Sequence, residues 1–160
     1  MNKSLLLKHI VEKLDAIHQG AINAAMQAYN TATHEENVAE NKYDTLGLGA
    51  AYLAQGQSQR VAECEADLTE FKKLPATVFS SYSPIDIDAL VCLKDELGAS
   101  QTLFLGPAAG GLKLSFDQKW ITLITLSAPL GATLRGRLVG DEIGLKLGGR
   151  EQFYEIVAVY

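Results

Sequence analysis

The side chains whose types and spacing could do chemistry lie in an acidic segment, residues 34–44. Glu35, Glu36, Glu40 and Asp44 fall within ten positions of one another. Carboxylate oxygens are the ligands that Mg²⁺ prefers, and the ion keeps several of its water molecules in such a site. A few carboxylates alone hold the ion weakly. We therefore expect this segment, called the acidic tip below, to act beside a second carboxylate cluster that already holds a metal.

Helix capping accounts for part of the acidic tip. Asn37 can accept a hydrogen bond from the backbone N–H three residues on, and Glu40 can reach back to the backbone N–H of Asn37. This arrangement would begin a helix and would explain both residues without any function. It does not account for Glu36 or for Asp44, so the metal-binding interpretation stays open.

Two long helical patterns flank the acidic tip. Residues 3–33 contain no proline, and residues 41–74 run up to Pro75, which ends a helix. Along both arms, residues suited to a helix–helix seam recur in alternating steps of three and four, as in a coiled coil. The seam of the first arm is Ile10, Leu14, Ile17, Ala21, Ala24 and Ala28, and that of the second is Gly47, Ala50, Ala54, Gln57, Val61, Cys64, Leu68 and Phe71.

Both seams are graded by size. Their large residues lie far from the acidic tip and their small residues lie near it, so an antiparallel pairing matches large with large. We predict an antiparallel coiled-coil hairpin over residues 1–74, with arms about 45 Å long at ~1.5 Å per residue. A hairpin packed along the rest of the chain is the alternative, which the narrow seam disfavours. Gly49 lies off the seam, and close packing does not explain it.

The sequence of the second half of the chain predicts a linker, residues 75–84, followed by a β-rich domain, residues 85–160. Ser127 is placed to cap a short helix, and Pro129 suits its first turn. The pattern predicts an α+β domain, an antiparallel sheet with one short helix on one face. The expected strands are Ile87–Leu93, Gln101–Leu105, Leu112–Phe116, Trp120–Leu126, Glu142–Leu147 and Gln152–Val159.

Composition excludes several classes of function. The net charge is −5, so any DNA binding would be weak, since contact with phosphates needs clustered Lys and Arg. Cys64 and Cys92 have no paired-motif spacing, which argues against a zinc site and a disulfide framework. No stretch approaches the ~20 apolar residues of a membrane span. We expect a cytoplasmic protein, with a monomer as the default.

The chain resembles the Gre-type (GreA/GreB) bacterial transcription elongation and transcript cleavage factors. The resemblance rests on the hairpin, on a tip that follows the pattern acid-x-x-Glu-Asn with Asn37 in the place of the acid, and on C-terminal motifs between residues 127 and 160. These motifs are Ser127-Ala-Pro-Leu-Gly, Leu134-Arg-Gly-Arg-Leu-Val-Gly-Asp141, Gly148-Gly149 and Phe153-Tyr-Glu-Ile-Val-Ala-Val-Tyr160. The resemblance implies an FKBP-like C-terminal domain. It also implies a hairpin that enters the secondary channel of RNA polymerase.

The resemblance assigns roles to the acidic tip. In the family, two tip acids help to hold the second Mg²⁺ and the attacking water at the polymerase active site, next to the RNA 3′ end. Glu40 matches the family's tip Glu, and Asn37 stands where the first acid is usually Asp. Asn offers a neutral oxygen, which weakens metal recruitment, and Glu36 could substitute from the adjacent position. The expected assisting residues are thus Glu40, Asn37 and Glu36, with Glu40 and Glu36 sharing the polymerase's Mg²⁺.

The resemblance also supplies a polymerase-binding site. Ser127 and Pro129 match the family's Ser-Pro corner, which docks on the rim of the secondary channel, and Leu130 completes the expected set. The protein would then be no enzyme itself but would stimulate the nuclease activity of RNA polymerase. Two alternatives stay open. One is a regulator that occupies the channel without cleavage and competes with cleavage factors. The other is an unrelated hairpin adaptor or a weak prolyl isomerase.

Overall fold

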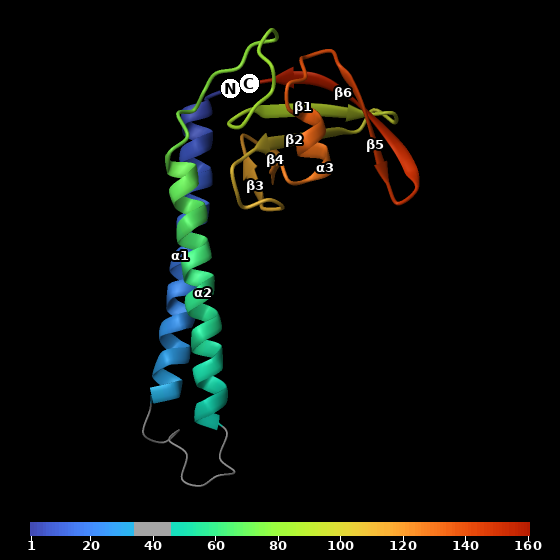
Figure 1. The fold of residues 1–160 in the computed structure, drawn as a ribbon. Helices are drawn as coiled ribbons and strands as arrows, with labels where there is room; N and C mark the ends of the chain where they lie inside the picture. The colour runs from blue at the N-terminus through green and yellow to red at the C-terminus, as the bar shows by residue number, and fades with distance from the viewer. Residues whose placement is uncertain (34–45) are drawn as a thin grey trace. The chain divides into compact units, whose positions relative to one another are not determined.

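A computed structural model describes the backbone of residues 1–33 and 46–160, with side chains described for residues 1–31 and 55–160. Two long helices, α1 (Lys3–Thr33) and α2 (Leu46–Lys72), precede a six-stranded sheet that carries one short helix, α3 (Pro129–Leu134) (Figure 1). The predicted fold class, a helical hairpin followed by a β domain with one short helix, is confirmed. The acidic tip lies outside the described residues.

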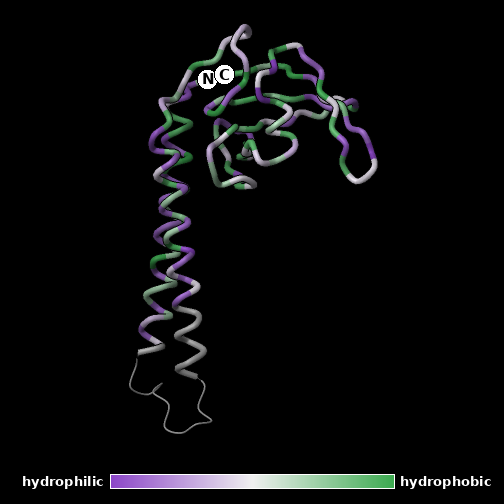
Figure 2. Tube along the Cα trace, viewed as in Figure 1, coloured by the Kyte–Doolittle hydropathy of each residue, from purple (hydrophilic) through white to green (hydrophobic). Residues whose placement is uncertain are grey.

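Helices α1 and α2 run side by side in opposite directions (Figure 1). The predicted seam is buried on both arms, at Leu14, Ala21 and Ala28 of α1 and at Cys64 and Leu68 of α2. Hydrophobic and hydrophilic positions alternate along the helices, as a narrow apolar seam requires (Figure 2). The seam residues Gly47, Ala50 and Ala54, like Gly49, lie where side chains are not described.

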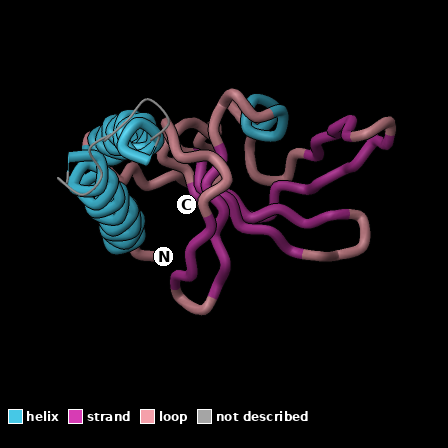
Figure 3. Tube along the Cα trace, turned by 90° about the horizontal axis from the view of Figure 1, so that it is seen from below, coloured by secondary structure: helices cyan, strands magenta, loops and turns pink. Residues whose placement is uncertain are grey.

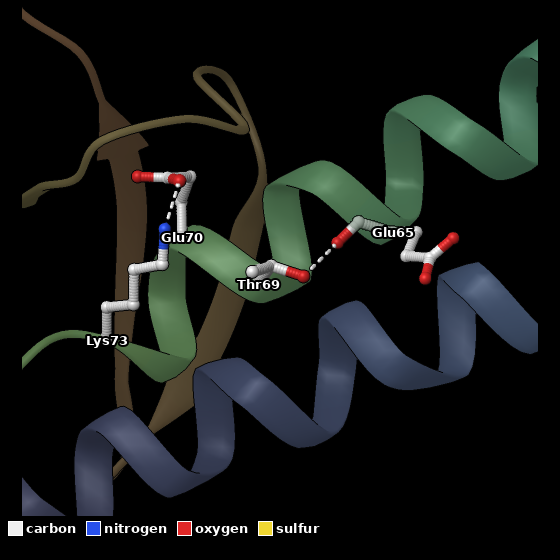
Figure 4. Close-up of polar contacts among 4 residues, drawn as sticks. All are labelled: Glu65, Thr69, Glu70 and Lys73. Carbon is white, nitrogen blue, oxygen red and sulfur yellow. Dashed lines mark hydrogen bonds and ion pairs between the residues drawn. The ribbon is translucent and has the colours of Figure 1, made fainter.

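The end of α2 follows from its sequence. Thr69 Oγ1 donates to the carbonyl oxygen of Glu65 at 2.9 Å, a local bond within the helix (Figure 4). Lys72 closes the helix with a positive charge, which is favourable at the negative end of the helix dipole. Lys73 Nζ lies 3.1 Å from Glu70 Oε1, but both side chains are well exposed, so this ion pair adds little stability.

All six predicted strands are present. Their bounds are β1 Leu90–Asp95, β2 Ser100–Leu105, β3 Lys113–Phe116, β4 Lys119–Ile124, β5 Glu142–Leu147 and β6 Arg150–Val159. The largest error is at the start of β1, which was expected at Ile87. Asp88 has a φ of 83°, a conformation incompatible with a strand, and the chain makes a turn there before pairing begins.

The prediction of an antiparallel sheet is wrong at one pair. The strand order is β3-β4-β2-β1-β6-β5, and β4 lies parallel to β2, with Thr102 opposite Ile121 and Leu105 opposite Ile124. The β3–β4 hairpin folds back so that β4, not β3, pairs with β2. Local residue patterns specify that a segment is a strand, but they do not specify which neighbour it selects.

The sheet is covered on one face by α3. Leu134 of α3 packs in a core with Leu103, Leu105 and Ile143 of the sheet, and the helix is seen beside the strands in Figure 3. The opposite face carries Phe104, whose ring centroid lies 6.3 Å from that of Phe71 at the end of α2. Both faces are therefore buried over part of the central strands, which explains the apolar runs at residues 90–93 of β1 and 103–105 of β2.

The chain divides into two compact units. One unit is residues 11–69, and the other joins residues 1–10 to residues 70–160, so the first turns of α1 group with the sheet. The domain boundaries at residues 74 and 84 stay predictions. In the part of the chain that the structure describes, no helix is long and apolar enough to cross a membrane.

Candidate functional site

The predicted docking corner lies where β4 leads into α3. After Ile124 the chain turns through Thr125 and Ser127, with the N–H of Ala128 donating to the Thr125 carbonyl at 3.2 Å. Pro129 is the first residue of α3, where the absence of an N–H costs nothing. Ser127 and Pro129 are both exposed. The corner thus exposes a hydroxyl and a rigid ring at the surface.

Ser127 does not cap α3, so that prediction is wrong. The N-cap residue is Ala128, in an extended conformation with no side-chain cap. Ser127 stands one residue too early, and its hydroxyl instead lies 2.7 Å from the hydroxyl of Thr125. The Ser127 side chain therefore stiffens the turn and leaves the remaining hydrogen-bonding capacity of its hydroxyl for a ligand.

Leu130 differs from the other two corner residues. Its side chain is half-buried and packs against the core cluster beneath α3. Leu130 therefore fixes the position of the helix, whereas Ser127 and Pro129 form the accessible surface. At the far end of α3, the N–H of Gly136 donates to the Ile85 carbonyl at 2.7 Å, so both ends of the helix are held.

Gly131 sets the position of the corner, and the sequence did not single it out as a site residue. A Cβ at this position would lie 2.0 Å from the Thr125 carbonyl oxygen and 2.9 Å from the Thr125 carbonyl carbon. These are backbone atoms, so they cannot rotate away as a flexible side chain would. Only glycine allows α3 to lie this close to the turn that carries Ser127.

Gly131→Ala is expected to destabilise the protein by about 1–3 kcal/mol, because the added methyl group overpacks a buried site against backbone. Chemical denaturation measures this change. Gly20→Ala is the matched control, since Gly20 lies in α1 with nothing within 4 Å of an added Cβ. The control is expected to stabilise α1 by up to ~1 kcal/mol. Equal effects of the two changes would contradict the close packing of α3.

The assisting residues of the acidic tip, Glu36, Asn37 and Glu40, lie outside the described residues, and the proposed Mg²⁺ site lies there with them. Within the described ranges, 1–33 and 46–160, no group of three His, Cys, Asp or Glu side chains is placed to hold a metal ion. The only predicted site residues that the structure brings together are therefore those of the docking corner.

Sequence reasoning missed a buried cation, Lys3. Its ammonium group donates to the backbone oxygens of Thr77, at 2.9 Å, of Tyr160, at 2.8 Å, and of Asp88. It also lies 5.2 Å from the ring centroid of Phe79 and is only 4 % exposed. One side chain thus joins the start of α1 to the segment at Thr77, the turn at Asp88 and Tyr160, the residue after β6.

The acid near Lys3 is also buried. Asp88 Oδ2 accepts a hydrogen bond from the Thr77 N–H at 2.6 Å. Burial lowers the pKa of Lys3 to about 8, against the opposing effect of the Asp88 charge. A signal for Lys3 was present in the sequence, since stepping back from Ile10 by three and four residues reaches Leu7 and then Lys3 on the same helical seam.

The comparisons with known proteins give likeness at the level of fold. No protein-family model matches the chain, and no curated protein matches it. Solved structures of Gre-type transcription factors do. Gfh1 (GreA factor homolog 1) of Thermus thermophilus is 20% identical, with a TM-score of 0.38 over 94% of each chain.

Two further solved structures are of the same type. Gfh1 of Thermus aquaticus is 18% identical, with a TM-score of 0.41 over 93% of this chain and 92% of its own. The GreA/GreB transcription elongation factor from Nitrosomonas europaea is 22% identical, with a TM-score of 0.38 over 60% of this chain and 78% of its own.

Proposed function

We propose that this protein is a transcription factor that binds bacterial RNA polymerase and inserts its helical hairpin into the secondary channel. The observation that carries the proposal is the exposed corner at Ser127 and Pro129, held by Gly131, in a chain that also has a long two-helix arm. The corner occurs at the residues where the sequence resembles the docking surface of Gre-type factors.

The hairpin supports this proposal through its dimensions. Helices α1 and α2 have 31 and 27 residues, so they reach about 46 Å and 40 Å at ~1.5 Å per residue. Their buried seam is narrow and is formed in part by alanine and cysteine, which keeps the pair slender. A slender arm whose two helices are separated in the sequence by an acidic segment is suited to carry carboxylates into a confined site.

For the activity at the tip, we propose stimulation of the cleavage of backtracked transcripts by the polymerase, with Glu40 and Glu36 sharing its Mg²⁺. The second candidate is a regulator that occupies the channel without cleavage. Asn37 favours the second candidate, because an amide oxygen replaces an anionic ligand for a hard divalent ion. A cleavage assay on a backtracked elongation complex separates the two.

Pro129→Ala is expected to weaken binding to core RNA polymerase by about fivefold to tenfold, because it removes a rigid exposed contact from the interface. The fold should persist, since alanine is a good helix former at the first position of α3. Competition with a labelled cleavage factor measures the affinity. Lys113→Ala, at an exposed position of β3, is the control. Unchanged affinity of the Pro129 variant would remove the corner from the interface.

A further inference from the structure

A groove lies over the ends of β1, β5 and β6, among residues that the predicted function does not use. Two adjacent cavities of about 360 and 400 Å³ share Asp95, Glu96, Phe153 and Tyr154 in their walls, so they form one continuous groove. Leu97 lies in one wall, and Glu142 lies in another. All of these residues come from the sheet and its turns.

The groove is strongly acidic. Its carboxylates are those of Asp95, Glu96, Glu142, Glu151 and Glu155, against two cations, Lys94 and Arg150. Asp95 is committed to its own turn, where Oδ1 accepts from the N–H groups of Leu97 and Ala99. Within the described residues, none of the five acids forms an ion pair. Their negative charge therefore remains available to a ligand.

Two of these acids stand directly opposite each other. Glu142 of β5 is the register partner of Glu155 of β6. Like charges at opposite positions of an antiparallel pair destabilise the sheet. Lys94, the register partner of Glu155 on β1, forms no ion pair with it, so its positive charge offsets only part of this repulsion. A bound cation on this face would offset it.

The groove also exposes apolar surface. Leu97 is 95% exposed and Phe153 is 45% exposed. The Phe153 ring rests over Gly144, where an added Cβ would lie 3.1 Å from ring carbon Cε1. The ring is thus held in place on the sheet while its edge stays open. An apolar centre surrounded by a polar rim is typical of protein interfaces.

We propose that this groove binds a basic segment of a partner protein, in which Arg or Lys residues flank an apolar residue. The cations would lie against Glu142 and Glu155, and the apolar residue would contact Leu97 and Phe153. Nucleic acid does not fit, because its phosphates would meet the same carboxylates. A second copy of this chain fits poorly, since its net charge is also negative.

The test measures binding of a short fluorescein-labelled peptide, with arginines around a central leucine, to the full chain by fluorescence polarisation. The double variant Glu142→Gln with Glu155→Gln is expected to weaken binding at least about tenfold, since it removes both facing charges. The charge-matched control is Glu12→Gln with Glu65→Gln, at exposed positions of the hairpin arms. This control should bind the peptide as the wild type does.

Two further measurements test the apolar contact and the charge repulsion separately. Leu97→Ser is expected to weaken peptide binding about threefold or more, which a purely electrostatic contact would not show. Glu142→Gln alone should raise the Tm, because it relieves the repulsion with Glu155. Equal losses in the groove variant and its charge-matched control would overturn the proposal. So would self-association of the wild type, measured by sedimentation, that the groove variant abolishes.

Discussion

Replacement of Glu40 by Gln is expected to abolish the stimulation of transcript cleavage while leaving the affinity for RNA polymerase unchanged. The change keeps the size of the side chain and removes the charge that would hold the shared Mg²⁺, since this ion prefers carboxylate over a neutral amide. The measurement is RNA cleavage in a stalled, backtracked elongation complex. Binding is followed in parallel through displacement of a known cleavage factor.

Asn37→Asp is expected to increase cleavage, because it places a second anion beside Glu40. Charge-assisted hydrogen bonds are roughly twice as strong as neutral ones, and a hard divalent cation prefers a carboxylate oxygen. A capping role makes a different forecast, since Asp and Asn are nearly equal as N-caps. Cleavage by the wild type and by this variant is therefore compared across a Mg²⁺ titration. If both are inactive at every Mg²⁺ level yet still displace the cleavage factor, the protein is a channel-occupying regulator.

Lys3→Met is expected to lower the free energy of unfolding by about 3–5 kcal/mol, the usual cost of removing one partner from a buried charged network. The variant would leave three backbone oxygens without their donor, and it would leave the Asp88 carboxylate without its nearby cation. Methionine is close to lysine in volume, so the substitution leaves no large cavity that would itself lower the free energy of unfolding. Urea denaturation gives the free energy.

Two variants control the Lys3 experiment. Lys8→Met, at an exposed position of α1, should change stability by less than about 0.5 kcal/mol. Asp88→Asn keeps the side-chain shape and an acceptor for the Thr77 N–H but removes the charge. If Lys3 and Asp88 are coupled, the double variant should cost less than the sum of the single variants. Additive costs would contradict the coupling.

Lys3 also predicts a pH dependence. Its pKa is about 8 in the folded protein, against 10.5 for an ordinary lysine. Between these values the unfolded chain binds a proton that the folded chain has released. The contribution of Lys3 to stability therefore rises with pH across this window and is lost as pH falls toward 8. The difference in unfolding free energy between wild type and Lys3→Met should grow from pH 8 to pH 10, and a constant difference would contradict burial of the charge.

The sequence by itself determined the local elements of this protein. The seven-residue spacing of Leu14, Ala21 and Ala28 requires one buried stripe on a helix, and the structure buries these residues. Pro75 and the lysines before it predict where α2 ends, and all six strands follow from short apolar runs bounded by turn residues. These properties depend on neighbours within a few positions, so the local pattern is enough to specify them.

The tertiary structure decided which distant groups meet. The parallel pairing of β2 with β4 depends on how a hairpin folds back, which no local pattern records. Gly131 is needed because α3 lies against the Thr125 carbonyl, and Lys3 is buried because backbone oxygens of Thr77, Asp88 and Tyr160 converge on it. The position of α3 and the environment of Lys3 depend on groups far apart in the chain, whose distances become fixed only when the sheet and helices pack.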